Sequence, residues 1–233
     1  MQRRSRLTLD YLPAYAPTPQ ELYKQIVTSE GWNYKRAETA EFMHTRDKAL
    51  VAILYLLALR VSEAIRLCKH QFSDPREDPR GKYIQVSDIL LSKRKKGRKE
   101  YNTIELPLEG ERAPLTKLVT DYLDLIEQPD RLFPWSLRET KTPIIGPNQY
   151  YIGKGGKQYQ RYSVRLMGTT RAWKIVKAIL PEITEHWLRA FGEDYTYDLS
   201  GKDVIATAAK YKIDPRTLAN SYLKRRAKKL PIR

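Results

Sequence analysis

The sequence has few of the side chains that build metal centres and covalent cross-links. Among its 233 residues there are a single cysteine, Cys68, and three histidines. One cysteine permits no disulfide within the chain, and so few thiol and imidazole ligands argue against a dedicated zinc site. We therefore expect no resident metal.

Long apolar segments are also missing. The longest run, Ala49 to Leu59, is much shorter than the roughly 20 residues that a membrane-spanning helix needs. The arginines near the N-terminus are followed by mixed polar sequence and not by the apolar core of a signal peptide. We therefore expect the chain to work inside the cell and without a membrane.

Positive charge, in contrast, is abundant. Lysine and arginine number 43 against 27 acidic residues, which leaves a formal net charge of +16. Such an excess predicts a polyanionic partner, either nucleic acid or an anionic membrane surface. Because the basic residues are clustered and membrane signals are missing, we favour nucleic acid. The alternative is a basic protein whose charge serves only solubility.

The predicted elements run from helices through a small sheet to further helices, which is an α+β arrangement, mainly helical, with a small antiparallel sheet. Thr18-Pro19-Gln20-Glu21 has the pattern of a capping box that starts a helix. We expect an N-terminal basic arm over 1–17, one domain over 18–233 and a loop over 73–81. Helices are predicted over residues 18–29, 36–59, 62–69, 115–127, 169–180, 182–192 and 201–211, and from 215 into the tail.

Two segments are predicted to be basic hairpins. Strand-forming runs at 83–86, 89–91 and 101–106 flank an almost wholly cationic stretch from Lys93 to Lys99. Residues 150–162 place tyrosines around a centre rich in glycine and lysine. Such charges suit contacts with a nucleic-acid backbone. The predicted contacts are Arg94, Lys95, Arg98, Lys99, Lys154 and Lys157, with Lys224, Arg225 and Arg226 in the tail.

Two short motifs place arginine near a second functional group. Arg60 ends the apolar run, where a half-buried guanidinium needs an anionic partner, and Glu63 follows at helical spacing. His186 and Arg189 are also three residues apart, so both can face one phosphate. Arginine offers a planar fork of donors, and histidine can donate to an oxygen or move a proton. The alternatives are a purely structural Arg–Glu pair and a solvated helix face.

The order of these motifs resembles a known family. Leu59-Arg60-Val61-Ser62-Glu63, after an apolar helix, resembles the first-arginine box of the tyrosine recombinases, which include phage integrases, Xer enzymes and many archaeal and viral integrases. His186-Trp187-Leu188-Arg189 resembles the second box, and Tyr222, counted without gaps from His186, falls where the family carries its nucleophile. The resemblance covers roughly residues 18–230 and implies the catalytic-domain fold of that family.

The resemblance also implies the chemistry, which is cleavage of a DNA strand by transesterification. Tyr222 would attack a phosphate and form a 3′-phosphotyrosine bond. Arg60, Arg189 and His186 would stabilise the charged transition state, with Glu63 supporting Arg60. Because the phosphotyrosine conserves the energy of the broken bond, no metal or other cofactor is implied.

The general acid for the leaving 5′ oxygen would be a lysine of the first basic hairpin. Lys93 best matches the family position, and Lys96 is the second candidate. Spacing back from Pro107 would instead favour Lys99. Lys93, Lys96 and Lys99 are therefore alternative candidates for the general acid.

The expected partner is double-stranded DNA, and family members act as homotetramers on paired recombination sites, often exchanging a C-terminal segment. The expected location is the cytoplasm of a prokaryotic host, with the gene on a virus, plasmid or other mobile element. We do not expect the N-terminal core-binding domain that usually accompanies the family's catalytic domain, so the chain would be either a catalytic fragment or a naturally short enzyme.

One position departs from the family pattern. Ile213 stands nine residues before Tyr222, where the family usually has His or Trp, so either Lys212 substitutes or one phosphate ligand is missing. Residues 201–224 also fit a helix-turn-helix. The alternative function is therefore a catalytically inactive recombinase-like or helix-turn-helix DNA-binding protein. If Tyr222 is not the nucleophile, Tyr211 is the next candidate.

Overall fold

The computed structural model describes residues 16–35, 37–91, 100–126, 132–133, 150–152, 158–160 and 167–219. Its helices are α1 (Pro19–Thr28), α2 (Ala37–Leu56), α3 (Val61–Ala64), α4 (Ala113–Asp124), α6 (Thr169–Ile179), α7 (Glu185–Leu199) and α8 (Val204–Lys210), with a 3₁₀ helix, η2, at Lys69–Gln71. Its strands are β1 (Arg76–Asp78), β2 (Gly81–Leu91), β3 (Glu100–Pro107), β4 (Tyr150–Ile152) and β5 (Gln158–Gln160). The predicted α+β class, mainly helical with a small antiparallel sheet, is confirmed. None of the helices in these ranges has the length and apolar content that crossing a lipid bilayer requires.

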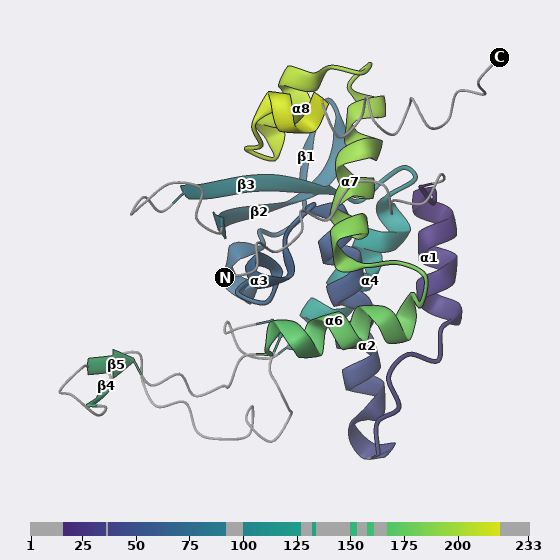
Figure 1. The fold of residues 1–233 in the computed structure, drawn as a ribbon, viewed down its shortest axis with the longest axis vertical. Coiled ribbons are helices and arrows are strands. Elements are labelled where there is room, and N and C mark those ends of the chain that lie inside the picture. The colour runs from purple at the N-terminus through teal and green to yellow at the C-terminus, as the bar shows by residue number, and fades with distance from the viewer. Residues whose placement is uncertain are drawn as a thin grey trace, which may run out of the picture.

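Helix α2 lies at the centre of the helical part, with α1, α4, α6 and α7 packed around it (Figure 1). Its apolar half and the residues that follow are core, because every residue from 49 to 59 is at most 3% exposed. The helix ends at Leu56, before the predicted end at 59, and Ala58 then adopts a left-handed backbone with φ of 48°. This bend brings the chain out of the core at Arg60.

Helix α1 begins as its sequence predicts. The backbone N–H of Glu21 donates to the Thr18 hydroxyl at 3.2 Å, and the backbone N–H of Thr18 donates to the Glu21 carboxylate at 2.8 Å. Pro19 occupies the first turn, where its missing N–H costs no hydrogen bond. Leu22 and Ile26 are fully buried, which fixes α1 against α2 and α4.

Strands β1, β2 and β3 form an antiparallel sheet in that order. The pairing of β2 with β3 confirms the first predicted hairpin. A bulge interrupts β2 between Val86 and Ile89, with Asp88 at a φ of 53°. The side-chain amide of Gln71 donates to two carbonyls inside this bulge, at 3.0 and 2.7 Å. A bulge bends its strand, so Gln71 helps to set the direction in which β2 continues along β3 after the bulge.

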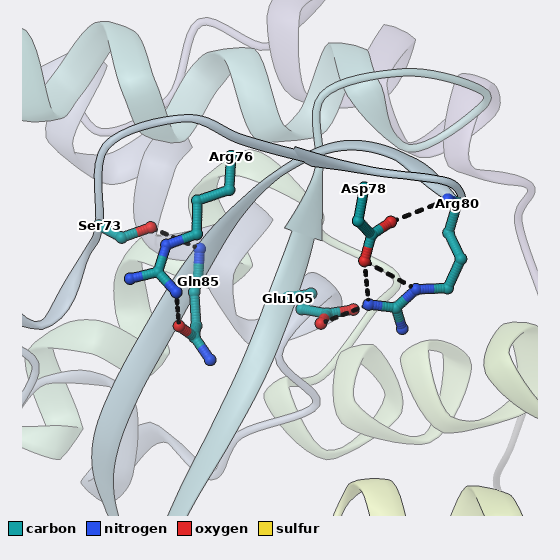
Figure 2. A network of polar contacts seen from close by, with 6 residues as sticks. All are labelled: Ser73, Arg76, Asp78, Arg80, Gln85 and Glu105. Carbon is teal, nitrogen blue, oxygen red and sulfur yellow. Dashed lines mark hydrogen bonds and ion pairs between the residues drawn. The ribbon is translucent and has the colours of Figure 1, made fainter.

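Strand β1 lies where the sequence predicts a loop over 73–81, and that prediction is wrong at this point. Side chains reinforce its pairing (Figure 2). Arg76 donates to Gln85 at 2.6 Å, and Arg80 bridges Asp78 at 2.5 Å and Glu105 at 3.0 Å. The hydrogen bonds from Arg80 hold the pKa of the Asp78 carboxyl below its ordinary value. Polar cross-strand pairs thus stabilise a strand that has no apolar alternation.

Two predicted helices have different ends in the structure. The helix predicted over 62–69 is only α3, Val61–Ala64, followed by a turn and η2. The helix predicted over 182–192 continues through Gly192 to Leu199 as α7. A glycine inside a helix marks close packing here and not a helix end. The hairpin predicted over 150–162 is confirmed as the β4–β5 pair.

The C-terminal helices form a small unit beside α7 (Figure 1). After α8 the chain is helical again over 215–219, and the carboxylate of Asp214 accepts the backbone N–H of Arg216 at 2.8 Å. Tyr197, Ala208 and Leu218 form a second buried cluster. Ile213 packs against this cluster and against the main core, so it joins the two.

Candidate active site

Arg60 is held at the bend between α2 and α3 by Glu63. The Arg60 backbone N–H donates to Glu63 Oε2 at 2.8 Å, and Arg60 Nη1 donates to Glu63 Oε1 at 3.1 Å. The Glu63 side chain is 3% exposed, whereas the Arg60 side chain is 41% exposed. A buried carboxylate therefore anchors an arginine that is partly exposed to solvent. The pairing predicted from the spacing of three residues is present.

Arg189 approaches the same carboxylate from α7. Its Nη1 lies 3.9 Å from Glu63 Oε2, and its Nε donates to Glu193 Oε1 at 2.8 Å. The Arg189 side chain is 15% exposed. Two arginines that are far apart in the sequence therefore flank one buried carboxylate. We refer to Arg60, Glu63, Arg189 and Glu193 as the arginine site.

Helix α7 is brought to this position by a close contact with α2. A Cβ atom built on Gly192 would lie only 2.0 Å from the carbonyl oxygen of Tyr55, so no other residue fits without a shift of backbone. The buried Arg112 adds a second restraint, since its Nη2 donates to the Gly192 carbonyl at 3.1 Å and to Thr196 Oγ1 at 3.3 Å. Together these contacts set the rotation of α7 and therefore the direction of Arg189.

His186 lies one turn before Arg189 but is not drawn into the arginine site. Its side chain is 64% exposed, and its Nε2 lies 3.9 Å from the carboxylate of Glu185. Within the described residues no hydrogen bond or ion pair joins it to Arg60, Glu63 or Arg189. Its phosphate-binding role stays a prediction.

The turn after α8 lies next to the arginine site. A small cavity is lined by Glu63, Arg189, Asn102 and Tyr211, among others. Asn102 donates to the Lys210 carbonyl at 2.9 Å, and the Lys212 ammonium donates to the Tyr101 carbonyl. These bonds tie the turn to the start of β3, the second strand of the first basic hairpin.

The departure at position 213 has a structural explanation. Ile213 is a packing residue between the main core and the C-terminal cluster. Lys212 beside it is exposed, and its contact with Tyr101 holds it on β3. Whether Lys212 also reaches a bound phosphate stays a prediction.

Tyr211, the second candidate nucleophile, is a buried structural residue. It is 3% exposed, and its hydroxyl is 2.6 Å from Thr196 Oγ1. Burial also raises the pKa of Tyr34, Tyr55 and Tyr122 above the ordinary phenol value. A raised pKa disfavours the phenolate, so these three side chains are poorly suited to attack a phosphate.

Several predicted site residues lie outside the described ranges. They are the nucleophile Tyr222, the candidate acids Lys93 and Lys96, and the predicted DNA contacts Arg94, Lys95, Arg98, Lys99, Lys154, Lys157, Lys224, Arg225 and Arg226. The first fifteen residues of the predicted arm over 1–17 also lie outside. The helix that starts at 215 is described as far as Ala219, three residues before Tyr222.

Glu193 and Arg112 are site residues that were not predicted from the sequence. Glu193 follows Arg189 by four residues, a spacing that places both on one helix face and that could have been noticed. Arg112 precedes α4 and meets α7 only in the folded chain, so no local pattern indicates it. In the part of the chain that the structure describes, no cluster of three or more His, Cys, Asp or Glu side chains could hold a metal ion.

Comparison with solved structures identifies the fold. A pre-cleavage complex of the XerH site-specific recombinase bound to its difH substrate aligns with a TM-score of 0.53 at 16% identity, over 93% of this chain and 53% of that one. The fold is that of a site-specific recombinase. A post-cleavage XerH complex with palindromic difH aligns with a TM-score of 0.51 at 16% identity, over 91% of this chain and 49% of that one.

The predicted tyrosine recombinase fold is therefore confirmed, and the chain spans about half the length of these recombinases. No protein-family model matches the sequence. No curated protein matches it either. The likeness to XerH thus lies in the arrangement of the elements, at an identity too low to carry over the roles of single residues.

Proposed function

We propose that the protein is a site-specific DNA recombinase, or integrase, that cleaves and rejoins DNA strands through a 3′-phosphotyrosine intermediate. The observation that carries the proposal is the meeting of Arg60 and Arg189 at Glu63. Two guanidinium groups that flank one carboxylate at a partly open surface can form a site for a tetrahedral oxyanion. The recombinase fold supports a DNA phosphate as that anion.

The reaction is a phosphoryl transfer. The Tyr222 oxygen attacks the scissile phosphorus, a bond forms between them, and the bond to the 5′ oxygen breaks. Lys93, with Lys96 as second candidate, donates a proton to the leaving oxygen. His186 donates to a non-bridging oxygen or accepts the Tyr222 proton. A free 5′ hydroxyl then attacks the phosphotyrosine, re-forms a phosphodiester and releases the tyrosine.

The arginine site would act mainly on the transition state. Negative charge accumulates on the non-bridging oxygens as the attacking oxygen arrives, and Arg60 and Arg189 would donate hydrogen bonds to those oxygens. Glu63 supports Arg60 through its buried carboxylate. Lys212 would supply a further cation from the turn before Tyr222.

The proposed partner is double-stranded DNA, bound by a homotetramer on paired sites in a prokaryotic cytoplasm and encoded by a mobile element. The net charge of +16 supports a polyanionic partner. XerH is bound to its difH substrate in the two similar structures. The basic hairpins and the tail would contact the phosphate backbone.

The test is covalent trapping. The full chain is incubated with fragmented DNA of the element that encodes it and denatured in detergent, and protein-bound DNA is detected on a gel. An adduct that survives denaturation supports the proposal, and sequencing the attached DNA gives the target site. Tight duplex binding without any adduct would overturn the enzyme assignment.

Replacing either arginine of the site should slow adduct formation strongly. Arg60→Gln and Arg189→Gln each remove a charged donor to the transition state, and we expect a loss of about 10²–10³-fold in the rate. Arg66→Gln is the matched control, because Arg66 is exposed just after α3. The rate is measured by quenching the reaction in detergent at timed intervals. Rates of both variants within twofold of the Arg66→Gln rate would contradict the assigned roles.

A second candidate function is DNA binding without cleavage. The specific observation in its favour is the C-terminal unit, in which α8, a turn and the capped helix from 215 share their own buried cluster. This arrangement resembles a helix-turn-helix, whose second helix enters a DNA groove. The trapping experiment separates the two functions, because a groove reader binds the duplex and forms no covalent bond.

A further inference from the structure

Glu193 is the one member of the arginine site that the proposed mechanism does not use. It lies on α7, one turn after Arg189, and the whole residue is only 9% exposed. Its Oε1 accepts a hydrogen bond from Arg189 Nε at 2.8 Å, a short charge-assisted contact. A nearly buried carboxylate therefore binds Arg189 at Nε, the guanidinium nitrogen nearest the main chain.

Stability does not account well for this pair. Withdrawing a carboxylate and a guanidinium from water carries a desolvation cost that their attraction only partly offsets, and well-packed apolar residues often serve stability equally well. The Arg189 and Glu193 side chains are 15% and 12% exposed, so both have lost most of their hydration. Such a pair is best explained by what it does to the orientation of Arg189.

The geometry indicates what that orientation achieves. Glu193 accepts its hydrogen bond from Nε and not from a terminal nitrogen of Arg189. Nη1 is 3.9 Å from Glu63, too far for a hydrogen bond, and neither Nη1 nor Nη2 donates to any described residue. Both terminal nitrogens are thus available to an incoming anion, with Arg60 on the other side of Glu63.

The charges of the arginine site also balance. The two arginines carry like charges and repel each other, and the carboxylates of Glu63 and Glu193 compensate those charges before any anion arrives. A donor that is already in place needs no reorganisation during the reaction, which is the main source of its catalytic effect.

We propose that Glu193 is a positioning residue, which fixes the guanidinium plane of Arg189 so that its two terminal nitrogens face the scissile phosphate. This inference rests on the proposed function. Glu193 does not touch DNA, so its loss should affect the rate of cleavage and not the affinity for the duplex. The hydrogen bond matters more than the charge, since an amide oxygen at the same place can also accept from Nε.

The test compares Glu193→Ala with Glu193→Gln, and Asp198→Ala serves as the control because Asp198 is an exposed acid on the same helix. A group displaced by about 1 Å can cost about 10²-fold in rate, so we expect a loss of that size in the rate of adduct formation for Glu193→Ala. The dissociation constant for duplex DNA should stay within twofold. Glu193→Gln should recover most of the lost rate.

A readout that does not depend on cleavage separates this inference from the proposed function. In NMR spectra, the Arg189 Nε–H signal should exchange slowly with water in the wild type and in Glu193→Gln, and rapidly in Glu193→Ala. A wild type that forms no adduct would overturn the proposed function, while the NMR comparison would still test the positioning role.

Three results would overturn the positioning role. The first is equal rates for the Ala and Gln variants. The second is a rate loss in Glu193→Ala that matches a loss of duplex affinity. The third is an Arg189 Nε–H signal that is unchanged by Glu193→Ala. Thermal melting of each variant identifies a folding defect. If Glu193→Ala is unfolded, the wild type is compared with Glu193→Gln, which keeps the hydrogen-bond acceptor.

Discussion

Tyr222→Phe is expected to abolish the covalent protein–DNA adduct completely while leaving duplex binding within about twofold. The substitution removes one oxygen atom, which is the nucleophile of the proposed reaction, and keeps the aromatic ring. The measurement is the trapping assay run in parallel with a binding titration of the same DNA. Loss of the adduct with retained affinity would assign the nucleophile.

The control for this experiment is Tyr211→Phe. Tyr211 is buried and its hydroxyl contacts Thr196 Oγ1, so the change should cost about 1 kcal/mol of stability and leave the adduct in place. If the adduct persists in Tyr222→Phe, the protein still carries out the recombinase reaction, and its nucleophile is another tyrosine. If the adduct is lost only in Tyr211→Phe, Tyr211 is the nucleophile. The reacting form of the protein must then expose this residue, which is buried in the present structure.

Gly192→Ala is expected to have the largest effect on folding. A methyl group there would lie 2.0 Å from the Tyr55 carbonyl oxygen, 3.1 Å from its carbon and 3.5 Å from Ala58 Cβ. The oxygen belongs to the last turn of α2 and accepts the backbone N–H of Ala58, so it cannot move alone. We expect a loss of about 3 kcal/mol or more, against the usual gain of about 1 kcal/mol for replacing glycine in a helix.

Thermal unfolding measures this effect, and for a chain of this size a loss of about 3 kcal/mol lowers Tm by roughly 6–12 °C. Gly168→Ala is the matched control, since Gly168 precedes α6 with no atom within 4 Å of a built Cβ and a φ of −77°. Its Tm should change by only a few degrees. A Gly192→Ala protein as stable as this control would show that α2 and α7 are not as close as the structure has them.

A folded fraction of the Gly192→Ala protein should also cleave slowly. Relief of the clash requires α7 to move away from α2, and Arg189 moves with it because it lies one turn earlier on the same helix. Arg60 and Glu63 lie together on the other side of the contact and keep their local hydrogen bonds, so Arg189 alone is displaced from Glu63. The packing of one glycine thus controls the geometry of the arginine site.

Local patterns accounted for several features of the fold. The capping box at Thr18 and Glu21 forms as predicted, because its hydrogen bonds join residues within one turn. The same holds for Arg60 and Glu63, which are three residues apart at the start of α3. The run from 49 to 59 is core because an uncharged apolar stretch of that length is stable only when it is buried.

Other features depended on partners distant in the sequence. Strand β1 has no apolar alternation, and it pairs through contacts such as Arg80 with Glu105 of β3. Helix α7 continues past Gly192 because the α2 backbone fills the place of the missing side chain. A propensity scale counts that glycine only as a cost to the helix.

The sequence was sufficient to indicate a basic, mainly helical α+β protein and to pair Arg60 with Glu63, because charge, periodicity and contacts within one helical turn are local properties. Tyr211 becomes buried only in the folded chain, and the approach of Arg189 to Glu63 and the burial of the Arg189–Glu193 pair arise only when α7 packs on α2. That contact needs a close fit between two backbones at Gly192, and such a fit is a property of packed surfaces that no short motif encodes.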